Sequence, residues 1–130
     1  MRGMTLVEMT VVILLLLSLV AIIFTAARGW KNGTDRARCI MNIRQMQISV
    51  RAFASASNFN PGTDLELHNP PVNLLSELVG AGQYVPALPT CPGNGFYFFG
   101  GDVIPEIGHL YMTCSLAGSQ GHQPSDSSNW

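Results

Sequence analysis

Nineteen consecutive residues near the N-terminus, 9–27, carry no charge and are mostly aliphatic. At ~1.5 Å per residue they form a helix of roughly 28 Å, close to the ~30 Å hydrocarbon core of a bilayer. Apolar residues cover every face of this helix, and the rest of the 130-residue chain is too short to surround it. A secretory signal peptide would instead combine a basic leader with a shorter apolar stretch and a small-residue cleavage site after it. We therefore expect a segment that inserts into a membrane.

A short motif stands immediately before this segment. It consists of a basic leader residue, a glycine, an apolar residue and a lone glutamate, in the run Arg2-Gly3-Met4-Thr5-Leu6-Val7-Glu8. The motif resembles the cleavage and methylation site of prepilins, the precursors of type IV pilins and type II secretion pseudopilins. The resemblance implies that a membrane peptidase cuts between Gly3 and Met4 and methylates the new amine of Met4. The leader is shorter than most in that family, as a start upstream of Met1 would explain, and Met replaces the commoner Phe.

Glu8 bears a physical burden, because a carboxylate at the edge of a hydrocarbon layer costs several kcal/mol unless it has a partner. The resemblance implies that Glu8 pairs with the N-terminal amine of a neighbouring subunit and sets the register of filament assembly. Two alternatives are a place in the headgroup region and pairing with the amine of its own chain, about 6 Å away along the helix.

The resemblance also implies a location and a set of partners. The chain would cross the bacterial inner membrane once, with its C-terminal part outside the cytoplasm, and then enter a pilus or pseudopilus filament. Partners would be further copies, other pilins or pseudopilins, the prepilin peptidase, and the assembly platform with its ATPase. A bare positive-inside count, with Arg28, Lys31, Arg36 and Arg38 after the apolar run, favours the opposite orientation. Protease protection in spheroplasts and inverted vesicles distinguishes the two.

The chain divides into four parts: a leader at 1–3, a transmembrane or filament-core helix at 4–27, a flexible glycine-containing junction at 28–34, and a second helix with a small head at 35–130. Gly29 and Gly33 weaken a helix, and Thr34 or Asp35 can cap a new one. From 35 to 57 the apolar residues recur every three or four positions, as in an amphipathic helix. They are Ile40, Ile43, Met46, Val50 and Phe53.

The residues after this helix predict a small α+β head. A loop rich in proline covers 58–71, and 73–79 has a capping Asn73, a helical apolar pattern and a glycine after it. Aromatic or alternating runs at 95–101 and 108–115, bounded by glycine, predict two antiparallel strands. The polar tail, 118–130, is expected to run over the surface with little regular structure. The predicted fold is pilin-like: a long N-terminal helix packed on a small antiparallel sheet.

Charge is distributed unevenly. All seven Lys and Arg residues lie at or before Arg51, whereas six of the eight acidic residues follow it. An acidic head excludes nucleic acid as its expected partner, because a phosphate backbone needs a cationic surface. No nucleophile with its base, phosphate-binding loop or pair of catalytic carboxylates is identifiable, so we do not expect an enzyme.

A second resemblance covers part of the second helix and the C-terminal region. The runs Arg38-Cys39, Asn42-Ile43-Arg44-Gln45, Cys91-Pro92-Gly93, Thr113-Cys114-Ser115 and Gly121-His122 are similar to those of pseudopilin-like proteins. Three cysteines in an oxidising compartment indicate one disulfide and one remaining thiol. We prefer Cys91 with Cys114, worth roughly 3–4 kcal/mol in the chain-entropy model, and Cys39 as a small apolar residue. Pairing of Cys39 with either other cysteine stays open.

We expect no metal and no cofactor. A zinc site made of Cys91, Cys114, His109 and His122 is the weaker option, because no C-x-x-C or H-x-x-x-H spacing is present, and the histidines are expected to be exposed. Calcium bound to oxygens of three acidic residues in the head is left open, since their spacing is irregular. These residues are Asp102, Glu106 and Asp126.

Two functions from different classes follow. The first is a structural subunit of a type IV filament, built by bundling of apolar helices. The second is a membrane-anchored extracytoplasmic binding module that uses the helix only as a tether. The sequence does not distinguish a pilus from a type II secretion pseudopilus, although the small head and the second resemblance favour a pseudopilin-like protein. Neighbouring genes would distinguish them, because a secretin with a secretion ATPase indicates a pseudopilus and a retraction ATPase indicates a pilus.

Overall fold

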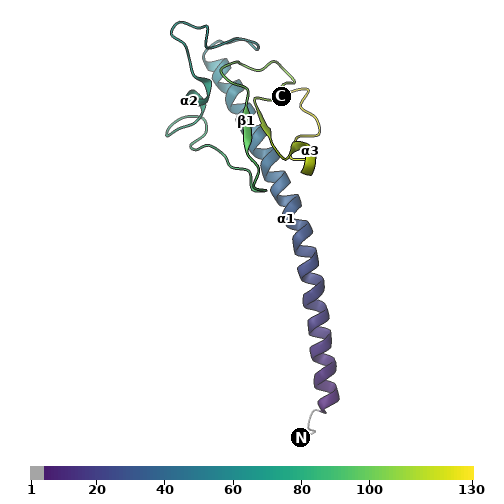
Figure 1. Ribbon diagram of the computed structural model, residues 1–130. Helices are drawn as coiled ribbons and strands as arrows, with labels where there is room; N and C mark the ends of the chain where they lie inside the picture. The colour runs from purple at the N-terminus through teal and green to yellow at the C-terminus, as the bar shows by residue number, and fades with distance from the viewer. Residues whose placement is uncertain (1–4) are drawn as a thin grey trace. The chain divides into compact units, whose positions relative to one another are not determined.

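The computed structural model describes residues 5–130, so the predicted leader, Gly3 and Met4 lie outside the described residues. Figure 1 shows the elements in chain order. They are α1 (Leu6–Ala56), α2 (Leu74–Leu78), β1 (Tyr97–Phe99), β2 (Met112–Cys114) and α3 (Ala117–Gln120). The chain divides into two compact units, 1–34 and 35–130, which we describe separately.

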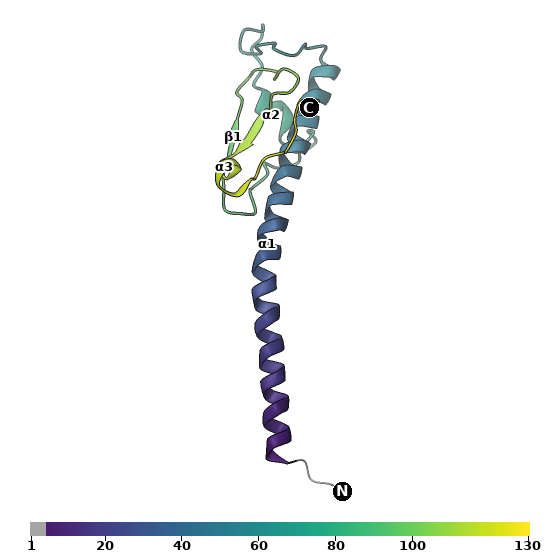
Figure 2. The same cartoon turned by 90° about the vertical axis from the view of Figure 1, so that its right-hand side faces the viewer.

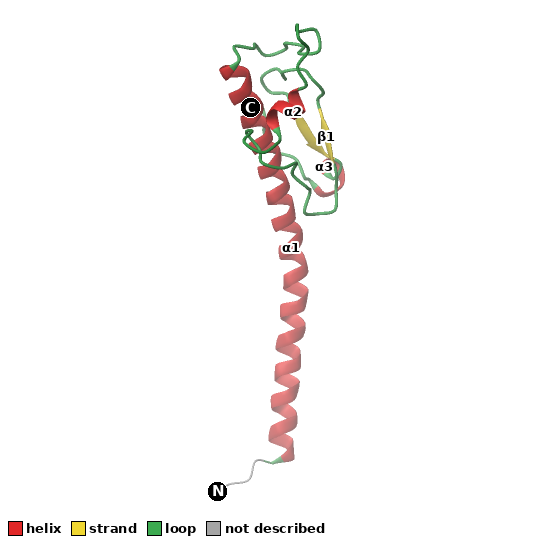
Figure 3. Cartoon of the chain, turned by 90° about the vertical axis from the view of Figure 1, so that its left-hand side faces the viewer, coloured by secondary structure: helices red, strands yellow, loops and turns green. Residues whose placement is uncertain are grey.

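Helix α1 is continuous through the stretch expected to be a junction, as Figure 3 shows in red. Gly29 and Gly33 are helical, and Thr34 does not cap a new helix, because its hydroxyl donates to the carbonyl of Trp30 (3.0 Å) within the same helix. The expected start of a second helix near Asp35 is therefore wrong. A glycine costs about 1 kcal/mol relative to alanine, which strong helix formers on both sides outweigh. Flexibility of this stretch stays a prediction.

The part of α1 that follows residue 35 carries the core of the head on one face. Ile43, Met46, Val50 and Phe53 of the predicted stripe are buried there, whereas Ile40 is half-buried. In Figures 1 and 2 the remaining elements of the head lie beside this half of the helix. They contribute Leu65, Leu74, Leu78, Val85, Ile104, Tyr111 and Met112 to the same core. The predicted amphipathic helix is confirmed by this packing.

The sheet consists of β1 and β2, paired antiparallel with Tyr97 opposite Cys114 and Phe99 opposite Met112. Both predicted strands are present, each reduced to three residues. Met112 and Cys114 point into the core, while Thr113 between them is exposed, as alternation in a half-buried strand requires. A long N-terminal apolar helix with a small antiparallel sheet confirms the α+β class.

Helix α2 forms within the predicted range 73–79. The Asn73 side chain accepts a hydrogen bond from the backbone N–H of Ser76 (3.0 Å), which is the expected N-cap. Asp102 adds a second acceptor at the same end, on the N–H of Leu74 (2.7 Å). Leu74 and Leu78, one turn apart, are buried in the core.

The tail from 118 onward runs over the surface with little regular structure beyond α3, as expected, and specific contacts hold it to the head. His122 is buried, and the Trp130 carbonyl accepts a hydrogen bond from Arg51 (2.9 Å). The Arg44 guanidinium lies over the Trp130 ring, 5.6 Å from its centroid. These contacts join residues far apart in sequence, so composition alone could not indicate them.

Gln47 connects α1 to the segment before β2. Its side chain is 2% exposed, donates to the carbonyl of His109 (3.0 Å) and accepts from the N–H of Tyr111 (2.8 Å). The amide thereby satisfies two backbone groups that no strand partner reaches in this segment.

We expect Gln47→Ala to lower the free energy of unfolding of the head by about 2–4 kcal/mol. Each buried backbone group left unpaired costs about 1–3 kcal/mol. Denaturation of the full chain in detergent, followed by near-UV circular dichroism, measures the change. Gln45→Ala is the matched control, since Gln45 lies on the same helix and is exposed. Equal stability of the two variants would contradict the role of Gln47.

Candidate functional site

The N-terminal end of α1 is capped by Thr5 and Glu8. The Glu8 carboxylate accepts from the Thr5 backbone N–H (2.8 Å) and hydroxyl (3.0 Å), and the Glu8 N–H donates to the Thr5 hydroxyl (3.4 Å). This reciprocal arrangement is a capping box, in which two helix-end N–H groups receive acceptors. The T-x-x-E spacing of Thr5 and Glu8 is visible in the sequence and predicts a capping box, but the prepilin motif, which includes the same residues, did not indicate it. Glu8 therefore has a partner within its own chain, different from the amine considered above.

The apolar segment of α1 presents its side chains to the outside. This stretch is strongly apolar, and none of it is buried within the protein. By length and composition this helix can cross a membrane, and it is the one such helix among the described residues. Large aliphatic side chains are exposed along the whole segment from Leu6 to Phe24. A continuous apolar surface of this kind needs lipid or another apolar surface to cover it.

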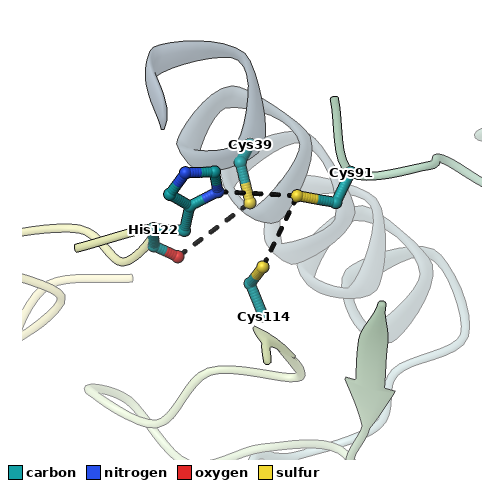
Figure 4. Close-up of side chains that lie close together, drawn as sticks. All are labelled: Cys39, Cys91, Cys114 and His122. Atoms are coloured by element: carbon teal, nitrogen blue, oxygen red, sulfur yellow. Dashed lines mark hydrogen bonds between the residues drawn. The ribbon is translucent and has the colours of Figure 1, made fainter. Parts of the chain in front are cut away.

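A second cluster of chemically active side chains lies inside the head. Cys39 comes from α1, Cys91 from the turn before β1, Cys114 from the end of β2, and His122 from the tail after α3. Figure 4 shows the three sulfur atoms and the imidazole ring turned toward one another. All four residues are buried, with exposed fractions of 0%, 7%, 4% and 1%. Their potential ligand atoms lie within 4.8 Å of one another.

The predicted Cys91–Cys114 disulfide is not formed in this structure, although the two residues are brought together. The Cys114 thiol donates to the Cys91 sulfur over 3.7 Å, and all three cysteines are thiols. Cys39 occupies the same cluster, so each pairing left open by the sequence joins residues that are near neighbours here. Which thiols oxidise stays a prediction.

Backbone geometry around Cys91 holds the cluster tightly. Asn94 donates its N–H to the Cys91 carbonyl (3.2 Å) and takes a positive φ of 62°, closing a turn of the sequence Cys91-Pro92-Gly93-Asn94-Gly95. A Cβ atom at Gly93 would lie 2.8 Å from Cε1 of His122, closer than packing permits. The turn therefore places the backbone directly against the imidazole ring.

The cysteines differ in acidity. Burial raises the pKa of the Cys91 thiol, but hydrogen bonds from the backbone N–H groups of Gly93 and Gly95, together with those from Cys114 and Cys39, bring this pKa below the ordinary value. Burial raises the pKa of Cys39 to about 12. The Cys91 thiol thus ionises more readily than the Cys39 thiol.

The other residues proposed as metal ligands lie elsewhere. His109 is exposed and does not join the cluster, whereas the burial of His122 corrects the expectation of an exposed histidine. Among residues 5–130, no group of three ligands includes Asp102, Glu106 or Asp126. Asp102 caps α2, and the Asp126 carboxylate accepts from the Ser128 N–H (2.9 Å).

Comparison with protein-family models, with curated proteins and with solved structures finds no match to this chain.

We expect Gly93→Ala to destabilise the head by about 1–3 kcal/mol, because the buried His122 ring cannot move away from the added methyl group. Gly118→Ala is the control. It lies in α3 with open space around it, and alanine there stabilises a helix by about 0.5–1 kcal/mol. Thermal unfolding of the full chain in detergent should rank Gly118→Ala at or above the unsubstituted protein and Gly93→Ala below it. A higher thermal midpoint for Gly93→Ala than for Gly118→Ala would contradict the close packing of Gly93 against the His122 ring.

Proposed function

We propose that this protein is a structural subunit of a type IV filament, pilin or pseudopilin-like, that is anchored in the inner membrane before assembly. The observation that carries the proposal is the exposed apolar segment of α1, whose N-terminal end holds Glu8. A bilayer covers such a surface in the stored subunit, and the apolar helices of neighbouring copies cover it in a filament. The head would face the extracytoplasmic side.

Glu8 would make the assembly specific. Its carboxylate satisfies helix-end donors in the single chain, and its charge is available to the methylated amine of Met4 in an adjacent copy. Opposite charges at the edge of a low-dielectric layer attract strongly, because water screens them little. Capping is therefore a local role of Glu8, and pairing between subunits is its proposed functional role.

Three substitutions separate these two roles. Glu8→Gln keeps an acceptor at the third helical position and removes the charge, whereas Thr5→Ala removes the hydroxyl of the cap and keeps the charge. We expect Glu8→Gln and Glu8→Ala to reduce sheared filaments about tenfold or more, since each ~1.4 kcal/mol of lost pairing is a factor of ten. Thr5→Ala should assemble nearly normally.

Filaments are counted by electron microscopy, and the membrane pool is measured by immunoblot to exclude loss of the protein. Assembly of Glu8→Gln at the unsubstituted level would show that the carboxylate serves only as a cap. A protein that stays monomeric in the membrane alongside a working assembly ATPase would identify the helix as a simple tether.

Processing gives an independent prediction. In cells with a prepilin peptidase, the mature chain should lack residues 1–3 and begin with N-methylated Met4, as intact-mass and N-terminal fragment spectra report. Gly3→Val should retain the leader, because a β-branched residue hinders access to the bond. An uncleaved unsubstituted chain in such cells would contradict the prepilin assignment.

A further inference from the structure

The cluster of Cys39, Cys91, Cys114 and His122 collects four metal-binding atoms from four segments, with ligands that lie 8 to 83 residues apart in the sequence. A core that needed only small apolar side chains would not require three thiols and an imidazole to face one another. Burial of all four also removes water as a partner for their polar atoms. The grouping therefore calls for a common ligand.

Two distances within the cluster fit a tetrahedral ion. With Zn–S bonds of about 2.3 Å and a Zn–N bond of about 2.0–2.1 Å, a tetrahedron separates two sulfurs by roughly 3.8 Å and sulfur from nitrogen by roughly 3.5 Å. Cys91 Sγ and Cys114 Sγ lie 3.7 Å apart, and Cys91 Sγ and His122 Nδ1 lie 3.5 Å apart. These two pairs are already at the spacing that coordination requires.

The surroundings suit thiolate ligands. Leu116 donates its backbone N–H to Cys114 Sγ (3.4 Å), and Tyr97 donates its hydroxyl to Cys39 Sγ (3.5 Å). Asn42, one turn after Cys39 on α1, donates to the Tyr97 oxygen (3.1 Å) and so orients that hydroxyl. Hydrogen bonds of this kind hold ligands in place and spread the negative charge of thiolates.

The net charge of the metal-bound cluster would be small. Three thiolates, a neutral imidazole and a divalent cation leave one negative charge in the head. The guanidinium of Arg36 lies against Gly121, the residue before His122, where it can offset that charge. Binding releases the three thiol protons to solvent, so no oxidant or reductant is needed.

A disulfide uses the cluster less completely. A Cys91–Cys114 bond would involve two of the four side chains and leave Cys39 with its hydrogen bonds to Tyr97 and to the His122 carbonyl, whereas coordination uses all four side chains. Three thiolates and one imidazole at a closed position, with no side open to substrate, are the donor set of a structural zinc site.

We propose that Cys39, Cys91, Cys114 and His122 bind one Zn²⁺ as a structural site in the head. The ion joins four segments: α1, the turn before β1, β2 and the tail. The two short strands alone do not connect all four of these segments. This departs from the sequence-based expectation that the protein contains no metal. It also extends beyond the proposed filament role, since the ion stabilises the head whether or not subunits assemble.

The test uses the full chain, expressed with zinc present and purified in detergent under reducing conditions. Elemental analysis by mass spectrometry should find one zinc per chain. Exchange with Co²⁺ should give the intense visible absorption of a tetrahedral thiolate site. A chelator should lower the thermal midpoint of the head and release the ion stoichiometrically.

Four variants locate the ligands: Cys39→Ser, Cys91→Ser, Cys114→Ser and His122→Ala. Each should reduce the bound zinc and the cobalt absorption to a small fraction, whereas His109→Ala, an exposed histidine in the same head, should keep both. If a ligand variant fails to fold, the metal content and cobalt spectrum of the unsubstituted chain still decide the matter.

Specific results overturn the proposal. One is an unsubstituted chain without zinc, whether its three thiols are free or its intact mass is two hydrogens lower through a disulfide. Another is a zinc content unchanged by the four ligand substitutions. Filament counts are a separate measurement, so a failed zinc site and a failed filament role are distinguishable.

Discussion

The folded structure of the head depends on one surface, the buried face of α1 between Cys39 and Phe53. A sheet of two three-residue strands is marginal without a surface to pack on, and a domain of this size buries too little apolar area to tolerate a gap. This face contributes apolar side chains to the core. Its Gln47 side chain pairs with backbone groups that have no strand partner, and its Arg51 side chain donates hydrogen bonds to three carbonyl oxygens in the C-terminal region. Core residues from the rest of the head pack against this face.

Much of this fold is predictable because its causes are local. An uncharged run of this length is helical and apolar, and residues at spacings of three and four bury one face. Asn73 caps α2 as expected, and Gly100 follows β1 directly in the sequence. Helix α1 does not end at the expected junction, although that stretch contains two glycines, Gly29 and Gly33. Their penalty is small relative to continuous helical hydrogen bonding on both sides.

The candidate sites were harder to predict for the opposite reason. Cys39 reads as a small apolar residue on a helix, and His122 as part of a polar tail, because each ligand of the cluster is alone in its own segment. Short-range ligand spacing identifies zinc sites built from one loop or hairpin, and it is uninformative when four segments contribute one ligand each. The Thr5–Glu8 cap, in contrast, has a local signature that the prepilin resemblance concealed.

The approach of Gly93 to His122 also affects which sequences the fold accepts. Loops are ordinarily the regions that vary most among related proteins, and cores the least. Here we expect the reverse, because Gly93 and Gly95 have no room for a single added carbon, whereas the exposed side chains of the apolar helix have no neighbour within the chain to match. Among related sequences, this turn should change more slowly than the long helix that dominates the composition.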